Sequence, residues 1–284
     1  MRVVETVNEV RETVKEWKKQ GLTVGLVPTM GFLHEGHASL IKKADEQCDR
    51  VVVSDFVNPT QFAPNEDLES YPRDIERDAA LCEESGADLI FHPAPEEMYA
   101  PDFSTYVNMT GPSDELCGKS RPIHFRGVCT VVSKLFNIVA PDRAYFGQKD
   151  AQQLAVIMRM VRDLNFDIEI VGCPIVREAD GLAKSSRNTY LNEAERKAAL
   201  ILHKALTEGE KLVRSGETDA KAVIQLISDR IRTEPLARID YVNIVSFPQI
   251  QPVDKIEGDI LAAVAVYFGT TRLIDNFIVK MECD

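Results

Sequence analysis

Short apolar runs alternate with amphipathic stretches from the start of the chain to about residue 175. The apolar runs predict strands at residues 22–27, 50–57, 88–91, 143–146 and 168–171. Apolar residues at helical spacing predict helices at residues 7–20, 39–48, 72–85, 127–139 and 151–164. Strands that alternate with helices are typical of a parallel sheet covered on both faces. We therefore predict an α/β fold with a Rossmann-like parallel sheet.

The pattern changes after Pro174. A polar loop at 181–188 is followed by helical stretches at 193–215 and 219–233, and then by apolar runs at 239–246, 260–268 and 272–279. The last two runs are joined by Gly269-Thr270, a tight turn that favours antiparallel pairing. We predict that residues 1–175 form the Rossmann-like domain and residues 176–284 a smaller α+β domain with an antiparallel sheet.

Charge and cysteine content narrow the class of protein. The 284 residues carry 45 acidic and 33 basic side chains, and the formal charge of −12 disfavours a broad nucleic-acid surface. The six cysteines, at positions 48, 82, 117, 129, 173 and 283, are scattered, with none within four positions of another. This spacing excludes the usual close-spaced zinc pairs and gives no sign of a disulfide framework. No apolar run approaches the roughly 20 residues of a membrane span. We expect a cytoplasmic protein with reduced, mostly buried thiols, bound to neither membrane nor nucleic acid.

Two histidines three positions apart follow the first long apolar run, in the segment Pro28-Thr29-Met30-Gly31-Phe32-Leu33-His34-Glu35-Gly36-His37. A turn from a strand into a helix binds phosphate well, because the first N–H groups of the helix lack partners and its dipole favours an anion. Imidazoles at such a turn can donate hydrogen bonds to a phosphate. The same pair is also compatible with a helix cap or with part of a metal site.

Three further polar segments lie at strand ends or in loops. Gly147-Gln148-Lys149-Asp150 separates a strand from a helix, although Asp150 is equally suited to cap that helix. Asn58-Pro59-Thr60-Gln61-Phe62 offers two neutral amides, and Asn-Pro is also a common turn. The loop 181–188 carries two hydroxyls and two cations, which suit phosphate oxygens but also an ordinary solvated loop. In the helix after Asp150, a solvated face is the simplest interpretation of Gln152-Gln153. Together the segments predict a nucleotide-binding enzyme, because ligands of parallel sheets bind at the carboxyl ends of the strands.

These segments, with Tyr71-Pro72-Arg73-Asp74, His124-Phe125-Arg126-Gly127-Val128 and Pro141 to Asp150, resemble the pantoate–β-alanine ligase (pantothenate synthetase) family, in order and at compatible spacing. His34 to His37 also resembles the HxGH motif of the wider superfamily of nucleotidyl transferases and class I aminoacyl-tRNA synthetases. Lys184 to Arg187 takes the place of that superfamily's KMSKS loop.

The resemblance implies a ligase with ATP as co-substrate and Mg²⁺ as the required metal. Pantoate and ATP first give pantoyl adenylate and pyrophosphate, and the amine of β-alanine then releases pantothenate and AMP. It also implies a homodimer in which the first domain binds nucleotide and pantoate and the second carries the phosphate-binding loop.

Carried over by position, the resemblance assigns catalysis to His34, His37 and Lys149, with His37 as the proton donor. It assigns pantoate to Gln61 and Gln153, β-alanine also to Gln61, and an assisting role to Asn58. The implied ATP-binding residues are Met30, Gly31, Phe32, Leu33, His34, Glu35, Gly36, His37, Gly147, Gln148, Lys149, Asp150, Val176, Lys184, Ser185, Ser186 and Arg187. Within this set, Asp150 is expected on the ribose, Val176 on the adenine, and Ser185, Ser186 and Arg187 on the phosphates. The metal ligands stay unassigned.

Three other functions remain open on the sequence. An adenylyl transferase with a phosphorylated acceptor would need a cationic pocket, whereas Asn58, Gln61 and Gln153 are neutral. An aminoacyl-tRNA synthetase fragment is disfavoured by the charge of −12. A non-catalytic nucleotide sensor is disfavoured by the presence of His34, His37 and Lys149.

Overall fold

A computed structural model describes residues 1–64, 66 and 68–281 of the chain. By their contacts these residues divide into two compact units. The first unit comprises Met1–Met109, Arg121–Gln148 and Val156–Pro174. The second comprises Thr110–Ser120, Lys149–Ala155 and Ile175–Asp284.

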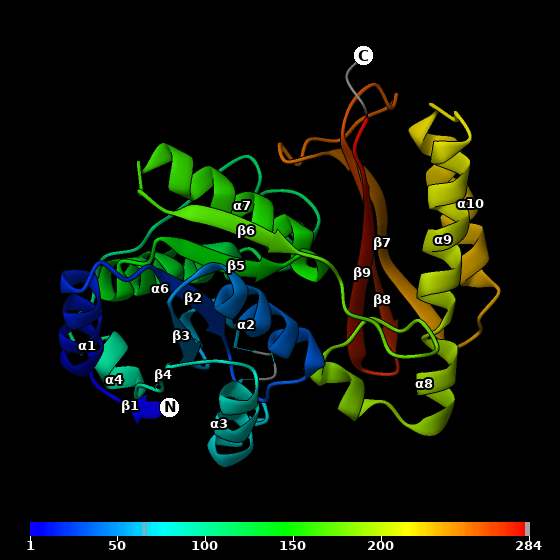
Figure 1. Ribbon diagram of the computed structural model, residues 1–284. Coiled ribbons are helices and arrows are strands. Elements are labelled where there is room, and N and C mark those ends of the chain that lie inside the picture. Colours follow the sequence, from blue (N-terminus) through cyan, green and yellow to red (C-terminus); the bar gives the residue numbers. More distant parts are fainter. Residues whose placement is uncertain (65, 67, 282–284) are drawn as a thin grey trace. The chain divides into compact units, whose positions relative to one another are not determined.

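The first unit is built on a six-stranded parallel sheet (Figure 1). Its strands are β1 (Arg2–Val4), β2 (Val24–Thr29), β3 (Arg50–Asp55), β4 (Leu89–Phe91), β5 (Arg143–Gly147) and β6 (Glu169–Cys173). Their spatial order is β1-β4-β3-β2-β5-β6, and every pair is parallel, which confirms the predicted fold class. Strand β1 was not predicted, because only two of its three residues are apolar, whereas the equally short β4 is apolar throughout. The chain order reverses between β2 and β5, and such a switch point is where open parallel sheets bind ligands.

Helices cover both faces of this sheet (Figure 1). Those of the first unit are α1 (Val7–Lys19), α2 (Glu35–Gln47), α3 (Ile75–Glu84), the single turn α4 (Pro95–Met98) and α6 (His124–Val139), together with the greater part of α7 (Ala151–Asp163). One face buries Val27, Val53 and Tyr145 with Leu40 and Ile41 of α2. Because side chains alternate along a strand, the neighbouring residues point to the opposite face, where α1 and α6 pack on β2.

Helix boundaries differ from the predicted ones where a polar side chain caps the first turn. Helix α3 begins at Ile75, three residues later than predicted, because the Asp74 carboxylate accepts the N–H of Arg77 at 3.1 Å. Helix α2 begins at Glu35, four residues earlier than predicted, because His34 serves as its cap. Histidine is not among the usual capping residues, so the pattern placed this start too late.

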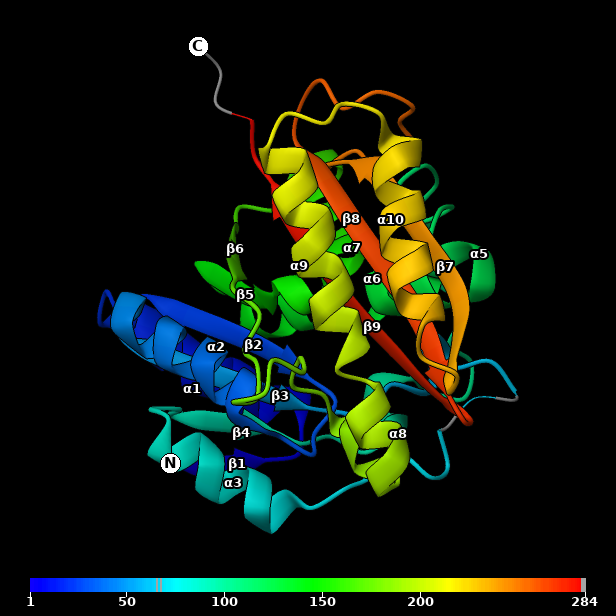
Figure 2. The same ribbon diagram turned by 90° about the vertical axis from the view of Figure 1, so that its right-hand side faces the viewer.

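The second unit contains an antiparallel sheet in the order β7 (Ala237–Ser246), β8 (Ile260–Phe268) and β9 (Thr271–Val279), as predicted. Helices α9 (Ile201–Arg214) and α10 (Ala220–Arg232) pack against one face of this sheet (Figure 2). The predicted helix 193–215 is wrong as a single element, since α8 (Glu193–Ala198) ends before α9 begins. At the break the N–H of Leu200 bonds to the carbonyl of Lys197 at 3.3 Å, a tightening that the apolar spacing does not reveal.

Both faces of the three-stranded sheet are buried. Leu273 and Phe277 belong to the core that includes the apolar residues of α9 and α10. Leu261 and Ala263 pack on the other face with Leu116, Ala151 and Ala155. The remaining short elements are the single helical turn α5 (Cys117–Ser120) and the 3₁₀ turns η1 (Pro59–Gln61), η2 (Gln148–Asp150) and η3 (Ser186–Tyr190).

The described cysteines are free thiols. Cys48, Cys82, Cys129 and Cys173 are buried, as predicted, and Cys117 is half-buried, while Cys283 lies outside the described residues. Among the described residues, none of the helices is both long enough and apolar enough to cross a bilayer.

Candidate functional site

The two histidines at the end of β2 cap helix α2 reciprocally. The N–H of Gly36 donates to His34 Nδ1 at 3.1 Å, and the N–H of His34 donates to His37 Nδ1 at 3.2 Å. The ring centroids lie 4.1 Å apart with a tilt of 37°. The helix-cap interpretation is therefore confirmed.

The caps fix the tautomer of both imidazoles. A ring nitrogen that accepts a hydrogen bond carries no proton, so a neutral imidazole held in this way has its proton on Nε2. His34 and His37 are thus assigned as Nε2–H donors at the N-terminus of a helix. Donors of this kind match the oxygens of a phosphoryl group.

A buried carboxylate in α3 holds the turn that precedes the histidines. Asp78, which is 1% exposed, accepts the N–H of Phe32 at 2.6 Å and the N–H of Leu33 at 2.7 Å. Arg77 donates to the carbonyl of Leu33 at 3.1 Å and lies 4.6 Å from the centroid of the Phe32 ring. Phe32 has a φ of 51°, a left-handed conformation that such contacts must stabilise. Two consecutive residues of α3 therefore set the path of the chain into His34.

Burial raises the pKa of Asp78 from 3.8 to about 6, and the nearby carboxylate of Asp55 acts in the same direction. The two backbone donors oppose this shift. Burial and the same two carboxylates raise the pKa of Cys82 to about 12, so this thiol stays protonated. A hydrogen bond to Asp55 raises the pKa of His92, whose Nδ1 lies 3.6 Å from Asp55 Oδ1. The groups that face Asp78 are thus one acid, one neutral thiol and, behind Asp55, an imidazole that favours its charged form.

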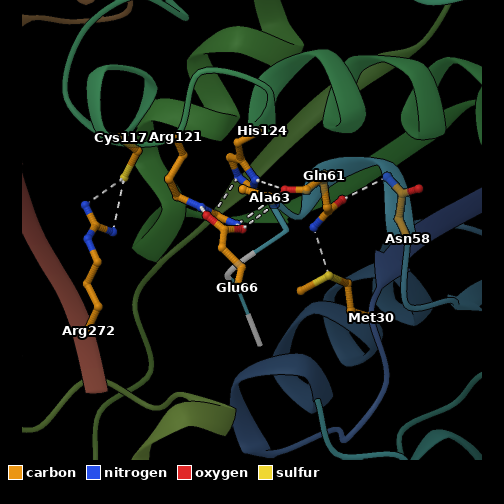
Figure 3. A network of polar contacts seen from close by, with 9 residues as sticks. All are labelled: Met30, Asn58, Gln61, Ala63, Glu66, Cys117, Arg121, His124 and Arg272. Atoms are coloured by element: carbon orange, nitrogen blue, oxygen red, sulfur yellow. Dashed lines mark hydrogen bonds and ion pairs between the residues drawn. The ribbon is translucent and has the colours of Figure 1, made fainter. Parts of the chain in front are cut away.

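Gln61 and Asn58 form a linked pair of amides just beyond β3 (Figure 3). Asn58 Nδ2 donates to Gln61 Oε1 at 3.1 Å and to the carbonyl of Gly127 at 3.2 Å. Gln61 Nε2 in turn donates to the sulfur of Met30 at 2.9 Å. The Asn58 carbonyl oxygen accepts from the Tyr99 hydroxyl at 2.7 Å and the Thr60 hydroxyl at 3.0 Å. Asn58 is thus only 1% exposed with both polar atoms engaged, and it directs the NH₂ group of Gln61 toward the end of β2.

The backbone of Gln61 is held from α6 and the segment before it (Figure 3). His124 Nδ1 lies 3.2 Å from the carbonyl oxygen of Gln61, and Arg121 donates to both carboxylate oxygens of Glu66, at 2.6 and 2.7 Å. A Cβ on Gly127 would lie 2.5 Å from Gln61 Cα, so only glycine permits this close approach.

In the second unit, Lys149 and Asp150 precede α7. Lys149 Nζ lies 3.5 Å from Asp150 Oδ2, and Lys149 is half-buried whereas Asp150 is exposed. Gln153 is half-buried in the first turn of α7. The solvated interpretation of Gln152 is wrong: it is buried, accepts the N–H of Cys117 at 3.0 Å and donates to the carbonyls of Pro112 and Glu115. Gln152 therefore orders the segment before α5.

The predicted phosphate loop in the second unit starts as a small hairpin. The N–H of Lys184 donates to the carbonyl of Val176 at 2.9 Å, and the N–H of Glu178 donates to the carbonyl of Leu182 at 2.8 Å. Ser185 caps the turn η3, with its hydroxyl accepting the N–H of Arg187 at 3.3 Å. Lys184, Ser185, Ser186 and Arg187 are all half-buried.

The sheet topology brings several predicted residues together in the first unit. Thr29 of β2 pairs with Asp55 of β3, so Met30 and Asn58 follow adjacent strand ends. Leu26 pairs with Ala144 of β5, and the same register extended by three residues brings Gly147 level with Thr29. Lys149, Asp150, Gln153, Val176 and Lys184 to Arg187 belong to the second unit. Asp78 was missed, because an acidic residue at one helical position looks solvated when its partners are backbone groups far away in sequence.

The sequence model of the family described as Pantoate-beta-alanine ligase matches residues 2–278. The chain belongs to the pantoate–β-alanine ligase family. The resemblance drawn from the motifs is therefore confirmed over nearly the whole chain.

Relatives of this ligase are similar over their full lengths. A pantothenate synthetase of Enterococcus faecalis is 62% identical over 99% of this chain and 100% of the relative, and one of Ruminiclostridium cellulolyticum is 61% identical over 98% of each. The crystal structure of pantothenate synthetase from Thermus thermophilus matches with a TM-score of 0.92 and 46% identity, covering 98% of this chain and 99% of that one. This chain is an ATP-dependent ligase that condenses pantoate with β-alanine.

A structure of pantoate-beta-alanine ligase from Francisella tularensis was determined with beta-gamma ATP and beta-alanine. It matches with a TM-score of 0.78 and 33% identity, covering 98% of this ligase and 97% of that chain. Within the described part of this ligase, no three His, Cys, Asp or Glu side chains gather in a way that could hold a metal ion. The metal alternative for His34 and His37 therefore has no support among the described side chains.

Replacement of Asp78 by Asn tests whether the pKa of this buried carboxyl is raised in the folded protein. Between pH 3.8 and about 6 the folded state keeps a proton on Asp78 that the unfolded state has lost, so stability falls as the pH rises through this range. Asn does not titrate. Denaturant unfolding should therefore show that the wild-type free energy of unfolding, relative to Asp78→Asn, falls by about 2 kcal/mol from about pH 4 to about pH 7.

The Asp74→Asn variant is the matched control, because Asn caps a helix as well as Asp and the residue lies on the same helix end. Because this variant keeps the Asp78 carboxyl, the fall in stability assigned to Asp78 should persist in it. Parallel curves for wild type and Asp78→Asn would contradict the assignment of a raised pKa to Asp78.

Proposed function

We propose that His34 and His37 act in the first step of the ligation, in which a pantoate carboxylate oxygen attacks the α-phosphorus of ATP and pyrophosphate leaves. The observation that carries this proposal is the pair of Nε2–H donors fixed by the cap of α2 at the switch point of the sheet. Negative charge builds on the α-phosphoryl oxygens in this step, and preorganised donors stabilise it without reorganisation. His37 is the proton donor of the pair.

Lys149 supplies the cation for the same oxygens in this proposal. Asp150 binds the ribose hydroxyls, Val176 the adenine through its backbone, and Ser185, Ser186 and Arg187 the phosphates, with Lys184 beside them. The turn η3, which follows the hairpin at 176–184, supports this assignment, since Ser185 and Ser186 bring hydroxyls and backbone N–H groups together in a way that suits phosphate oxygens. Met30 to His37, Gly147 and Gln148 complete the nucleotide site.

Pantoate is bound by Gln61 and Gln153, and β-alanine also by Gln61. The orientation of the Gln61 amide supports a donor role toward the hydroxyl and carboxylate oxygens of pantoate, because its Oε1 is occupied by Asn58. Asn58 itself acts through Gln61. In the second step the β-alanine amine attacks the acyl carbon of pantoyl adenylate, and AMP, a far better leaving group than an oxide, departs.

The required Mg²⁺ arrives with ATP in this proposal. Mg²⁺ keeps several waters and is held mainly by substrate phosphates, which suits a chain whose described residues offer no three-ligand group. Residues 1–175 bind nucleotide and pantoate, and residues 176–284 carry the phosphate loop. The ligase works as a homodimer in the cytoplasm, and its partners are the small molecules ATP, pantoate and β-alanine rather than nucleic acid or membrane.

An assay that omits one substrate at a time tests the two-step scheme. Pyrophosphate release should require ATP and pantoate but not β-alanine, because adenylation precedes attack by the amine. Pantothenate formation should require all three. Release of pyrophosphate that depends on β-alanine would contradict the order of steps, and release with a phosphorylated acceptor but not with pantoate would favour another adenylyl transferase.

The His37→Ala variant tests the role of the histidine pair. Turnover should fall by about 10² or more while the KM for ATP stays within about threefold of wild type, as expected for a group that acts mainly in the transition state. Steady-state kinetics of pyrophosphate release measures both values.

The matched variant is His37→Gln, whose amide can place an N–H near the position of the imidazole Nε2. It should lose less turnover than His37→Ala. Unchanged turnover in His37→Ala would refute a catalytic role for this residue.

A further inference from the structure

Two adjacent polar residues interrupt the apolar strand β9. Asp275 and Asn276 follow Leu273-Ile274 and precede Phe277, and they are 3% and 5% exposed. Neighbours on a strand point to opposite faces of the sheet. The packing of the neighbouring apolar residues shows the same alternation, because Leu273 and Phe277 belong to the helix-covered face and Ile278 packs on the other. Asp275 therefore faces the helices, and Asn276 faces the side of Ala151 and Ala155.

On the helix-covered face, Asp275 holds the base of the phosphate loop through Arg177. Arg177 donates to both Asp275 oxygens, at 2.7 and 3.0 Å, and also to the carbonyl of Gly181 at 3.1 Å. Gly181 has a φ of 99°, and a Cβ there would collide with the ring of His203. The guanidinium fork thus joins the strand to the turn from which Ser185, Ser186 and Arg187 continue.

On the opposite face, Asn276 holds the backbone of Lys149. Its side-chain Nδ2 donates to the Lys149 carbonyl oxygen at 2.8 Å. The main-chain N–H of Asn276 also donates to Asp275 Oδ1 at 2.8 Å, so the two side chains are coupled through one peptide unit. One strand therefore contacts the backbone of Lys149 with one residue and the base of the loop with the next.

We infer that Asp275 and Asn276 are positioning residues that fix Lys149 and the loop 181–188 relative to each other, and so align the cations and hydroxyls that receive the ATP phosphates. This inference rests on the proposed function, which assigns those segments to ATP. Burying a charged pair costs desolvation energy, and apolar residues of similar size often serve stability as well or better. We therefore explain the buried ion pair of Arg177 and Asp275 by its effect on the position of the phosphate loop, not by its contribution to stability.

A second ion pair of the same sheet, between Arg272 and Asp240, offers a control for the pair of Arg177 and Asp275. Arg272 donates to Asp240 at 2.8 Å and lies 3.7 Å from the sulfur of Cys117 (Figure 3), and its contacts among the described residues reach neither Lys149 nor the loop. The side chains of Arg272 and Asp240 are 17% and 23% exposed, against 24% and 2% for Arg177 and Asp275. Asp240→Asn therefore removes a second, less buried ion pair from the same sheet without touching the ATP-binding segments.

The test compares the two half-reactions in Asn276→Leu and Asp275→Asn. Pantoate-dependent pyrophosphate release needs the β- and γ-phosphates in place, whereas pantothenate formation from supplied pantoyl adenylate and β-alanine does not. Misplacing reacting groups by about 1 Å can cost about 10²-fold. For Asp275→Asn, which acts on the phosphate loop, we expect the first half-reaction to fall by about 10- to 10²-fold and the second by less than about threefold. Asn276→Leu should lower both half-reactions, because Lys149 is assigned to the α-phosphoryl oxygens that pantoyl adenylate retains. Asp240→Asn should lower both by less than about twofold.

Equal loss of both half-reactions in Asp275→Asn would overturn the inference, because it would show that Asp275 only stabilises the fold. An unchanged first half-reaction in either variant would overturn it too. If Asp275→Asn does not fold, Arg177→Lys carries the same test, since lysine keeps the charge but loses the fork that reaches Asp275 and Gly181 together. The wild-type enzyme distinguishes failure of the proposed function from failure of this inference. Absence of pantoate-dependent pyrophosphate release in the wild type would refute the proposed function. Loss of both half-reactions to the same extent in Asp275→Asn would refute only this inference.

Discussion

The reciprocal cap of helix α2 is the constraint on which the rest of the site depends. A helix that starts at a strand end leaves N–H groups that need acceptors, and here two imidazoles supply them. Each ring spends Nδ1 on the backbone and is left with a proton on Nε2. Catalytic orientation and helix stability therefore come from the same two hydrogen bonds, so one cannot be altered without the other.

The residues around the cap fix its geometry at a cost in folding free energy. Asp78 accepts two backbone donors at the turn before His34, yet burial and Asp55 oppose its ionisation. A left-handed Phe32 and a glycine at position 31 with a φ of 78° complete a turn that an unconstrained chain would rarely adopt. Strain of this kind is typical of functional sites, where a fixed geometry matters more than maximal stability. Asn58 and Gly127 act in the same way on Gln61, through contacts that leave little freedom to the backbone.

The strands and long helices could be predicted because their apolar periodicity is strong, and the strand order then gathered the end of β2 and Asn58 at one edge. Three features could not be predicted. The cap by His34 uses a residue type that rarely caps, the roles of Asp78 and Gln152 rest on backbone partners 35 to 46 positions away, and the break before Ile201 is a local tightening without an apolar signature. Each of these depends on tertiary contacts that a one-dimensional pattern does not contain.

The role of the cap is tested most directly by determining the tautomer of the two capping histidines. Nitrogen-15 NMR of the histidine side chains at a pH where the rings are neutral, with His34 and His37 assigned by single substitutions, reports which ring nitrogen carries the proton. Both residues should show a protonated Nε2 and an unprotonated Nδ1. A proton on Nδ1 of either ring would mean that the cap bond is absent and that its Nε2 does not donate to the phosphoryl group.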